Sequence, residues 1–326
     1  MKMGPDLEWK GPIMMKPQSR RSFLTSGGAA TAAVALTHGM PGAAWAAAAG
    51  RRLGIELYSV KAGLAKDVPG TLAALAAIGY KFVETGVQST IPAKDLRAAL
   101  DAAGLSCPSA HLRFTTDDPG PLLDEAHTLG AQYAVSSVLL TVNSPFGGKK
   151  VPGAGNFLQA INGLSVDDFK QIAALANNIA AKTKAAGLQY AYHNHNFEFR
   201  VLDGGKTGYD VLLAETDPEL VKFELDCGWM VAAGFSPVEY MAKNPRRYRM
   251  IHVKDFQAGT RPTAILMGPD SPKGTELGRG HIDYKPIFKA AEKAGVEYYF
   301  REQEPPIADM TEMEAARANY QYMRGI

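Results

Sequence analysis

The segment Tyr190–Phe199, with the sequence YAYHNHNFEF, determines how the rest of this chain can be read. It begins as an apolar run typical of a buried strand and reaches two histidines and a glutamate before it ends. Side chains alternate along a strand, so His193 and His195 lie on the same side as Ala191. A buried strand that runs directly into paired imidazoles indicates a metal or acid–base site at its C-terminal end. Histidines on the surface, or bonded to backbone groups in a core, are the alternative interpretation of this segment alone.

Apolar segments of similar length recur on both sides of it, separated by amphipathic stretches. The expected strands are 53–60, 81–87, 105–112, 132–140, 188–194, 221–226, 248–254 and 297–302. The expected helices include 68–80, 93–104, 121–130, 166–187 and 311–323, several of them followed by the glycine that commonly ends a helix.

This alternation predicts the fold class. Eight strand–helix units in about 275 residues are typical of a single (β/α)8 TIM barrel of the α/β class. An open doubly wound sheet is disfavoured because the first strand leads into SVKAGLAKD (59–67), which is no glycine-rich phosphate loop. In a barrel the active site lies where the strands end, and the long loops 141–163, 195–207 and 255–281 are expected to wall it.

The first 46 residues differ from the rest and predict an export signal. The paired Arg20 and Arg21 in SRRSFL are followed by an uncharged Ala/Gly/Thr-rich run and a small-residue cleavage pattern at 44–46. The pair resembles a twin-arginine signal. The run has too few Leu, Ile and Val residues for a transmembrane helix. We therefore expect a signal over 1–46, a barrel domain over 47–326, export by the twin-arginine machinery to the periplasm or beyond, and no stable membrane span.

Charge and cysteine content exclude some partners. The chain is 46% apolar and 21% charged, with 35 basic and 33 acidic residues. The expected signal holds five of the basic and two of the acidic residues, so the mature chain carries a net charge of −1. Such a balance argues against a nucleic-acid partner. Cys107 and Cys227 lie far apart in apolar segments, which favours small buried hydrophobic residues over a metal knuckle or a disulfide.

Ionisable residues gather at the predicted strand ends. They are Glu84, His111, His193, His195, Glu224, Asp226, His252, Lys254, Glu302 and Glu304. Such groups are costly to bury in a barrel unless they are paired or bind a metal ion. The mixture of imidazoles and carboxylates suits one divalent ion, with Mn²⁺, Zn²⁺, Co²⁺ and Mg²⁺ as the candidates.

Five motifs in this order carry a resemblance that spans residues 51–324. The chain resembles the sugar phosphate isomerase/epimerase superfamily with its xylose isomerase-like barrel. The motifs are HNHNFEF (193–199), FELDCGW (223–229), IHVKDF (251–256), GRGHID (278–283) and FREQE (300–304). The resemblance implies four strand-end ligands around one divalent ion that binds neighbouring oxygens of a sugar. It assigns Asp226, His252 and Glu302 to three of these positions.

The fifth strand departs from the pattern of these relatives. Many of them have Glu-Asn-His where this chain has His193, Asn194 and His195. The resemblance therefore assigns the fourth ligand to His193, while Glu198 could instead reach back and restore a carboxylate. A metal-bound imidazole cannot act as the second base that epimerases of the family use. Either Glu198 or His195 takes that role, or the chemistry is one-sided.

The resemblance also implies roles in catalysis and substrate binding. Glu302 is the first candidate for the base that removes the proton next to a carbonyl. Lys254 either stabilises an enediolate oxygen or donates a proton, and an ion pair is its alternative role. Five more residues are expected near the substrate: Glu84, His111, Trp229, Arg279 and His281. Glu84 and His111 would bond substrate hydroxyls or orient the ligands, and Arg279 and His281 would bind a hydroxyl or an acidic group. Trp229 would stack on a sugar ring, with ordinary packing as its alternative role.

These features predict a metal-dependent sugar isomerase or epimerase that acts through an enediolate. A dehydratase, or a lyase acting on a keto-glycoside, would use the same site and is the alternative. A non-catalytic sugar-binding barrel is the rival from another class, and the charge balance disfavours a DNA-repair endonuclease with this barrel. Export favours a carbohydrate without a phosphate group. The sequence leaves the substrate, the metal and a homo-oligomeric state open.

Overall fold

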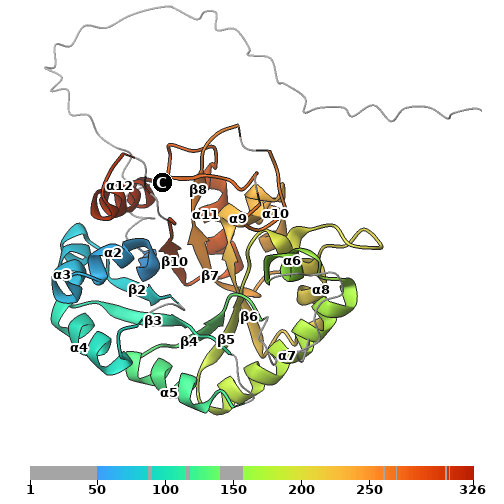
Figure 1. Cartoon of the computed structure of the whole chain (residues 1–326), viewed down its shortest axis with the longest axis horizontal. Coiled ribbons are helices and arrows are strands. Elements are labelled where there is room, and N and C mark those ends of the chain that lie inside the picture. Colours follow the sequence, from blue (N-terminus) through green and yellow to red (C-terminus); the bar gives the residue numbers. More distant parts are fainter. Residues whose placement is uncertain are drawn as a thin grey trace, which may run out of the picture. The chain divides into compact units, whose positions relative to one another are not determined.

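Among the residues that the structure describes, eight parallel strands close into a barrel in the computed structural model of this protein (Figure 1). They follow one another around the barrel in chain order, and the last strand pairs with the first to close it. Their bounds are β1 Arg52–Glu56, β2 Phe82–Thr85, β3 Ser106–His111, β4 Tyr133–Ser136, β5 Gln189–His193, β6 Val221–Asp226, β7 Tyr248–Val253 and β10 Tyr298–Arg301. The predicted TIM barrel is confirmed, and each expected strand overlaps one of these eight, although the fourth ends at Ser136 and not at Leu140.

The structure describes residues 50–86, 90–114, 118–139, 157–259, 261–268, 270–304, 307 and 309–326. The expected signal over 1–46 therefore lies outside the described residues. So does most of the expected loop 141–163, up to residue 156.

Helices surround the strands on the outside (Figure 1). The longest, α7, begins with a capping box in which Ser165 accepts a hydrogen bond from the Asp168 N–H and the Asp168 carboxylate accepts one from the Ser165 N–H. Three others, α4, α5 and α11, end at glycines in the left-handed conformation, as the helix–glycine junctions of the sequence predict. The helices are α2 Lys61–Leu64, α3 Val68–Ile78, α4 Ala93–Ala103, α5 Gly120–Leu129, α6 Phe157–Asn162, α7 Val166–Ala185, α8 Gly208–Glu215, α9 Cys227–Ala232, α10 Pro237–Lys243, α11 Tyr284–Ala294 and α12 Glu312–Gly325.

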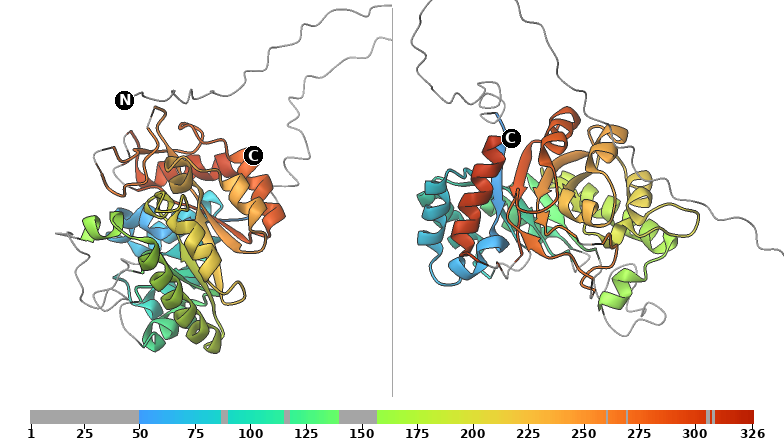
Figure 2. Two further views of the ribbon diagram at one scale, coloured as in Figure 1. Left: turned by 90° about the vertical axis from the view of Figure 1, so that its right-hand side faces the viewer. Right: turned by 90° about the horizontal axis from the view of Figure 1, so that it is seen from above.

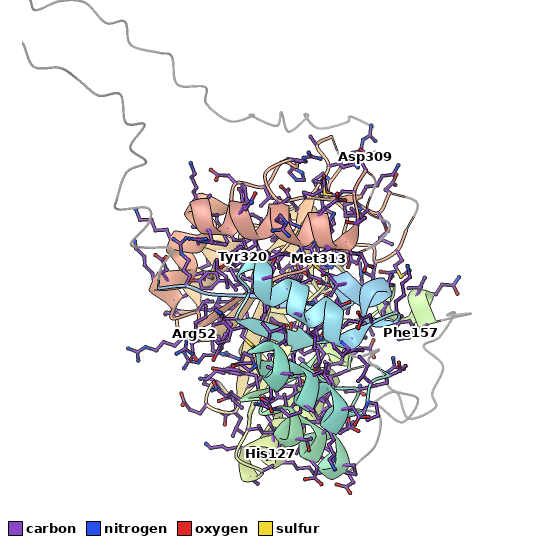
Figure 3. All side chains as sticks on the ribbon, turned by 90° about the vertical axis from the view of Figure 1, so that its left-hand side faces the viewer. Arg52, His127, Phe157, Asp309, Met313 and Tyr320 are labelled. Carbon is purple, nitrogen blue, oxygen red and sulfur yellow. The ribbon has the colours of Figure 1, made fainter. Side chains whose placement is uncertain are left out.

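The last helix joins the two ends of the barrel domain. In Figure 2, α12 runs beside the first helices of the domain, and Figure 3 shows Tyr320 on the side of α12 that faces α3. The Tyr320 hydroxyl donates to the Gly79 carbonyl at 2.8 Å, and the Tyr80 hydroxyl donates to the Ala316 carbonyl at 3.0 Å. These contacts hold α12 against the C-terminal end of α3.

Two apolar layers fill the domain, and the inner one sets the floor of the site. A large cluster packs between the strands and the helices. A smaller cluster lies on the other side of the strands, inside the barrel: Tyr133, Val135, Ala191, Met250, Tyr298 and Phe300. Because side chains alternate along a strand, residues two positions beyond these face the same interior. His193 follows Ala191 in this way, and His252 follows Met250.

Two features of the sequence prediction needed correction. The first strand was expected to run to Val60, but β1 ends at Glu56 and continues as a 3₁₀ turn, η1 (Leu57–Val60). The expected loop 255–281 contains a short antiparallel pair, β8 (Asp255–Phe256) and β9 (Gly274–Thr275).

The expectation for the cysteines was also met. Cys107 and Cys227 are both free and buried. No helix among the described residues is both long enough and apolar enough to cross a bilayer.

Candidate metal centre

Four side chains that the sequence assigns as ligands meet at the C-terminal end of the barrel. His193 ends β5, Asp226 ends β6, His252 lies near the end of β7, and Glu302 directly follows β10. One ligand atom from each of the four lies within 4.8 Å of those of the other three. His193, Asp226 and His252 are buried, and the Glu302 side chain is 13% exposed. The group is a buried cluster of imidazoles and carboxylates of a composition that suits a divalent ion.

Asp226 provides the clearest test of whether a cation fits here. Its Oδ1 accepts the Trp229 N–H at 2.7 Å and so caps α9. Its Oδ2 is buried and accepts no hydrogen bond from any described residue, although Lys254 Nζ lies 3.3 Å away. A buried carboxylate oxygen without a hydrogen-bond donor is costly, and a metal ion would satisfy it. The donor set and this oxygen therefore fit a metal ion held by His193, Asp226, His252 and Glu302.

His252 links the cluster to carboxylates on two sides. Its Nδ1 lies 2.9 Å from Glu302 Oε2, and its Nε2 lies 2.6 Å from Glu84 Oε2. Burial opposes the charged form of His252, but Glu224 and Glu84 outweigh burial and raise its pKa well above the usual value. Burial likewise disfavours ionised Glu302, yet Lys254 and His252 hold the pKa of that carboxyl well below its usual range. Glu302 is thus ionised and able to accept a proton.

Lys254 lies within an ion-pair network at the edge of the cluster. Its Nζ is 2.9 Å from Glu302 Oε2 and 2.8 Å from Glu304 Oε1. Burial alone would lower the pKa of Lys254, but Asp226 and Glu302 raise it well above the ordinary value, so the ammonium is retained. The ion-pair role weighed for this lysine is the one that the structure displays.

A second layer of ionisable residues lies beneath the four ligands. Glu224 Oε2 is 2.9 Å from both His111 Nε2 and His193 Nδ1, and 3.3 Å from His252 Nε2. Glu84 accepts a hydrogen bond from the Ser109 hydroxyl and contacts His252. His111 and Glu84 therefore touch the ligand histidines and their carboxylate partners. This arrangement favours an orienting role for both over direct substrate binding.

His195 and Trp229 lie together beside the cluster. Their rings are 6.0 Å apart, and the His195 ring is 5.1 Å from that of His193. His195 Nδ1 is buried and has no hydrogen-bond partner among the described residues. Burial and the proximity of His193 hold the pKa of His195 well below its usual value, so its imidazole is neutral. Trp229 is 6% exposed and Lys254 Nζ lies 4.8 Å from its ring centre, which favours packing over stacking on a sugar.

Glu198 lies apart from the cluster. After β5 the chain turns into η2 (Phe197–Phe199), which takes this carboxylate to the outer side of the strand. Glu198 Oε1 accepts the Tyr192 hydroxyl at 3.0 Å, and Oε2 accepts the His195 N–H at 2.9 Å. Both oxygens are occupied, so the structure favours His193 over Glu198 as the ligand from this segment. Burial raises the pKa of Glu198 from 4.5 to about 8.

A Glu198→Gln variant is expected to keep its fold and its metal affinity. An amide can accept the His195 N–H and donate to the Tyr192 oxygen, so both hydrogen bonds survive. A carboxyl whose folded-state pKa is raised weakens the folded state progressively as pH rises from about 4.5 towards 8. The variant should therefore gain stability relative to wild type across that window, as denaturant unfolding at several pH values would show. Loss of metal binding in this variant would return Glu198 to the ligand set.

Arg279 and His281, expected near the substrate, lie elsewhere in the described loop. Arg279 is largely exposed and pairs with Glu276 at 3.5 Å. His281 is exposed, and its Nδ1 lies 2.9 Å from the Phe256 carbonyl. The loop is held by Asp255, whose carboxylate accepts N–H groups from Gly278 and from the three residues Gly280, His281 and Ile282. The structure therefore does not bring either residue into the cluster.

Glu56, on β1, is a residue of the site that the sequence analysis missed. It is buried, and its Oε2 has no hydrogen-bond partner among the described residues. Burial and the charge of Glu302 raise its pKa well above the usual value. The sequence did contain a clue, since Glu56 is a carboxylate in an apolar strand. That strand was expected to run to Val60, however, so Glu56 was not recognised as a residue at a strand end.

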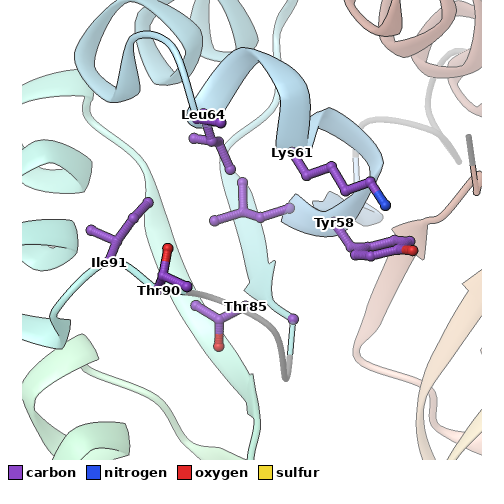
Figure 4. Close-up of a pocket in the computed structure, with 9 residues that line it drawn as sticks. Tyr58, Lys61, Leu64, Thr85, Thr90 and Ile91 are labelled. Carbon is purple, nitrogen blue, oxygen red and sulfur yellow. The ribbon is translucent and has the colours of Figure 1, made fainter.

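A cavity of about 300 Å³ lies at the ends of β1 and β2 (Figure 4). Its lining is mainly apolar, with Lys61 as the cation: Leu57, Tyr58, Lys61, Leu64, Thr85 and Ile91. A second cavity of similar volume shares Thr85 and Ile91 with it and includes His111.

Comparison with known families identifies the class of protein that the fold and this cluster define. Residues 72–325 match the model of the xylose isomerase-like TIM barrel family, and the chain belongs to this family of sugar isomerase, epimerase and dehydratase barrels. Residues 17–37 match the twin-arginine signal sequence. The predicted export out of the cytoplasm by the twin-arginine route is therefore confirmed.

The chain is similar to individual proteins with two different names. The chain is 29% identical to an inosose dehydratase of Geobacillus thermodenitrificans, over 77% of this chain and 86% of the relative. It is 26% identical to an inosose dehydratase of Clostridium perfringens, over 73% and 83%. The structure of a sugar phosphate isomerase/epimerase from Parabacteroides distasonis superposes with a TM-score of 0.64 at 26% identity, covering 85% of this chain and 94% of that one.

Proposed function

We propose that this enzyme removes a proton next to the carbonyl of a keto sugar or keto cyclitol and then expels a β-hydroxyl group as water. It would act as a metal-dependent dehydratase. The observation that carries the proposal is the one-sided arrangement of bases around the candidate metal centre. Glu302 is ionised beside the cluster, whereas the position on β5 is an imidazole and Glu198 points away.

The ligand set would be His193, Asp226, His252 and Glu302. A divalent ion held there would supply Lewis acidity, which makes a C–H bond next to a carbonyl more acidic. Lys254 is held charged at 2.9 Å from Glu302 Oε2, and it keeps this carboxylate in a fixed position. Its ammonium also offers positive charge to an enediolate oxygen that forms beside it.

An elimination needs only one base on one face of the substrate. Glu302 takes the proton, and the C–H electron pair moves towards the carbonyl to form an enediolate. When the carbonyl forms again, the β-hydroxyl group leaves, and with the proton held by Glu302 it makes water. The step needs no oxidant and no second carboxylate. Similarity to two inosose dehydratases supports this outcome, because an inosose is a keto cyclitol.

Epimerisation is the second candidate, and one observation favours it. His195 carries a buried, unpartnered Nδ1 among the described residues and a neutral imidazole beside the cluster. In one direction of an epimerisation a neutral imidazole can remove the substrate proton, and in the other direction the resulting imidazolium can return it to that same face, while Glu302 serves the opposite face. The 26% identity to the Parabacteroides distasonis sugar phosphate isomerase/epimerase points the same way.

Incubation in D₂O with a panel of substrates separates these outcomes. The panel is an inosose, several unphosphorylated keto sugars and several 3-keto-glycosides, each with Mn²⁺, Co²⁺ or Zn²⁺. We expect a product lighter than its substrate by one water. Deuterium in a recovered isomer or epimer, without loss of water, would contradict the dehydratase and establish the second candidate. Release of an aglycone would identify a lyase.

A further inference from the structure

Glu224 is the point at which three imidazole rings meet. It lies on β6, directly opposite His193 of β5 in the strand register, and its side chain is fully buried. One of its oxygens, Oε2, is within 2.9 Å of His193 Nδ1 and His111 Nε2 and within 3.3 Å of His252 Nε2. No other described carboxylate in the domain is recorded with three histidines on one oxygen.

These contacts determine which ring nitrogens carry hydrogen. A neutral imidazole has one N–H and one lone pair, and the nitrogen that faces a carboxylate must be the donor. His193 Nδ1 therefore donates to Glu224, which leaves the lone pair on Nε2. His252 faces carboxylates through both nitrogens, since Nε2 lies against Glu84 and Nδ1 against Glu302. The same rule gives each of them a hydrogen, so a cation bound on the side of Asp226 and Glu302 would replace the proton on Nδ1.

We propose that Glu224 is a positioning residue of the metal centre. Through its hydrogen bond it fixes the tautomer and the ring orientation of His193, so that Nε2 is the ligating atom. The Glu224 carboxylate also places a negative charge next to His193, which as a neutral imidazole carries none. This inference rests on the proposed metal site and adds to it a residue that acts through His193 without touching the ion.

The inner group, His111, His193, Glu224 and His252, could also be interpreted as a second metal site, because its ligand atoms also lie within 4.8 Å of one another. Two of its members, His193 and His252, belong to the outer group as well. Both rings would have to lose both protons to bind an ion on each side. The close contacts within the inner group are already ordinary hydrogen bonds, whereas the unsatisfied Asp226 Oδ2 lies in the outer group.

A Glu224→Gln variant tests the proposal in the full mature protein. The amide can accept from only one side, so the His193 ring loses its anionic partner. We expect Co²⁺ affinity to fall about 10–100-fold, the usual effect of removing a partner of a ligating histidine. The visible absorption of bound Co²⁺ should also change in position or intensity. Glu198→Gln is the matched control, since it makes the same change at another fully buried glutamate and should alter neither readout.

A further substitution, this time at position 193, gives a readout that Glu224 would not produce if its role were only structural. In His193→Glu, the new carboxylate would face Glu224 across the strand pair, and two buried carboxylates in contact repel each other. Adding Glu224→Gln to that variant removes the repulsion and provides an amide donor. We expect the same Glu224→Gln change to weaken Co²⁺ binding in wild type and to strengthen it in the His193→Glu background.

Failure of this inference is distinct from failure of the metal site. Wild-type protein that binds no Co²⁺ at all would overturn both. If wild type binds one Co²⁺ ion and Glu224→Gln binds it with the same affinity and the same absorption spectrum, the positioning role alone is overturned. Two ions per wild-type chain, falling to one in Glu224→Gln, would show instead that the inner group is a second metal site. Should Glu224→Gln alone fail to fold, the positioning role is still tested by comparing Co²⁺ affinity between His193→Glu and the double variant that adds Glu224→Gln.

Discussion

An Asp226→Asn variant is expected to bind its divalent ion more than about 100-fold more weakly than wild type while keeping its fold. An asparagine side chain retains the oxygen that accepts the Trp229 N–H, so the cap of α9 survives. It replaces Oδ2, the buried oxygen without a hydrogen-bond partner among the described residues, by an NH₂ group that cannot bind a cation. Removing a ligand should cost more than removing a partner of a ligand, which costs about 10–100-fold.

Metal analysis and thermal unfolding check this result together. Wild type should carry about one ion per chain, as one site of four ligands predicts. Ion at about 100 times its Kd should stabilise wild type by about 2.7 kcal/mol. That metal-dependent rise in Tm should vanish in Asp226→Asn. Asp283→Asn makes the same change at an exposed helix cap, where the aspartate accepts the Lys285 N–H, and should bind metal normally. Full metal retention in a His252→Ala, Asp226→Ala double variant would contradict the site.

The sequence predicted those parts of the site that follow from strand alternation. Each ligand lies at or just past a strand end, and period-two alternation places His193, His252 and Glu302 on the same face as a small or apolar residue that fills the barrel. His193 follows Ala191, and His252 follows Met250. Closure of the barrel then brings these ends together. Alternation thus predicts the ring of ionisable residues at the strand ends, and the family resemblance selects four of them as proposed ligands.

Residues beyond the regular strands were placed less well, for identifiable reasons. Glu198 lies where β5 has already turned into η2, so alternation no longer predicts its direction. Arg279 and His281 lie in a loop whose path is set by backbone N–H groups bonded to Asp255, and sequence periodicity carries no signal for such contacts.

The role of Glu224 needed the three-dimensional register. The pairing of β6 with β7 shifts between Phe223 and Glu224. The carboxylate of Glu224 contacts histidines of β3, β5 and β7, an arrangement that no single strand pattern encodes. Sequence reasoning recognised the residue as an ionisable group at a strand end but could not identify its three partners.

A Glu302→Gln variant is expected to lower turnover about 10²–10⁴-fold at saturating metal and substrate, the usual contribution of a positioned general base. The amide cannot take a proton from carbon, but its oxygen can still contact a cation, so substrate should continue to bind. Because Glu302 is also a proposed ligand, rates must be normalised to bound metal. A fall in kcat with little change in KM would indicate a group that acts on the transition state.

Glu304→Gln is the matched control for this prediction. Glu304 lies two residues further along the same segment and pairs with the same lysine at 2.8 Å, but it is outside the four-residue cluster, and its side chain is 35% exposed. We expect its replacement to change turnover far less than that of Glu302, since it touches neither the proposed ion nor the reacting carbon. Exchange of the substrate α-proton with D₂O should fall in parallel with turnover in Glu302→Gln and persist in Glu304→Gln. If the protein were a sugar-binding barrel without catalysis, wild type would show no exchange, and Glu302→Gln would bind the sugar with unchanged affinity.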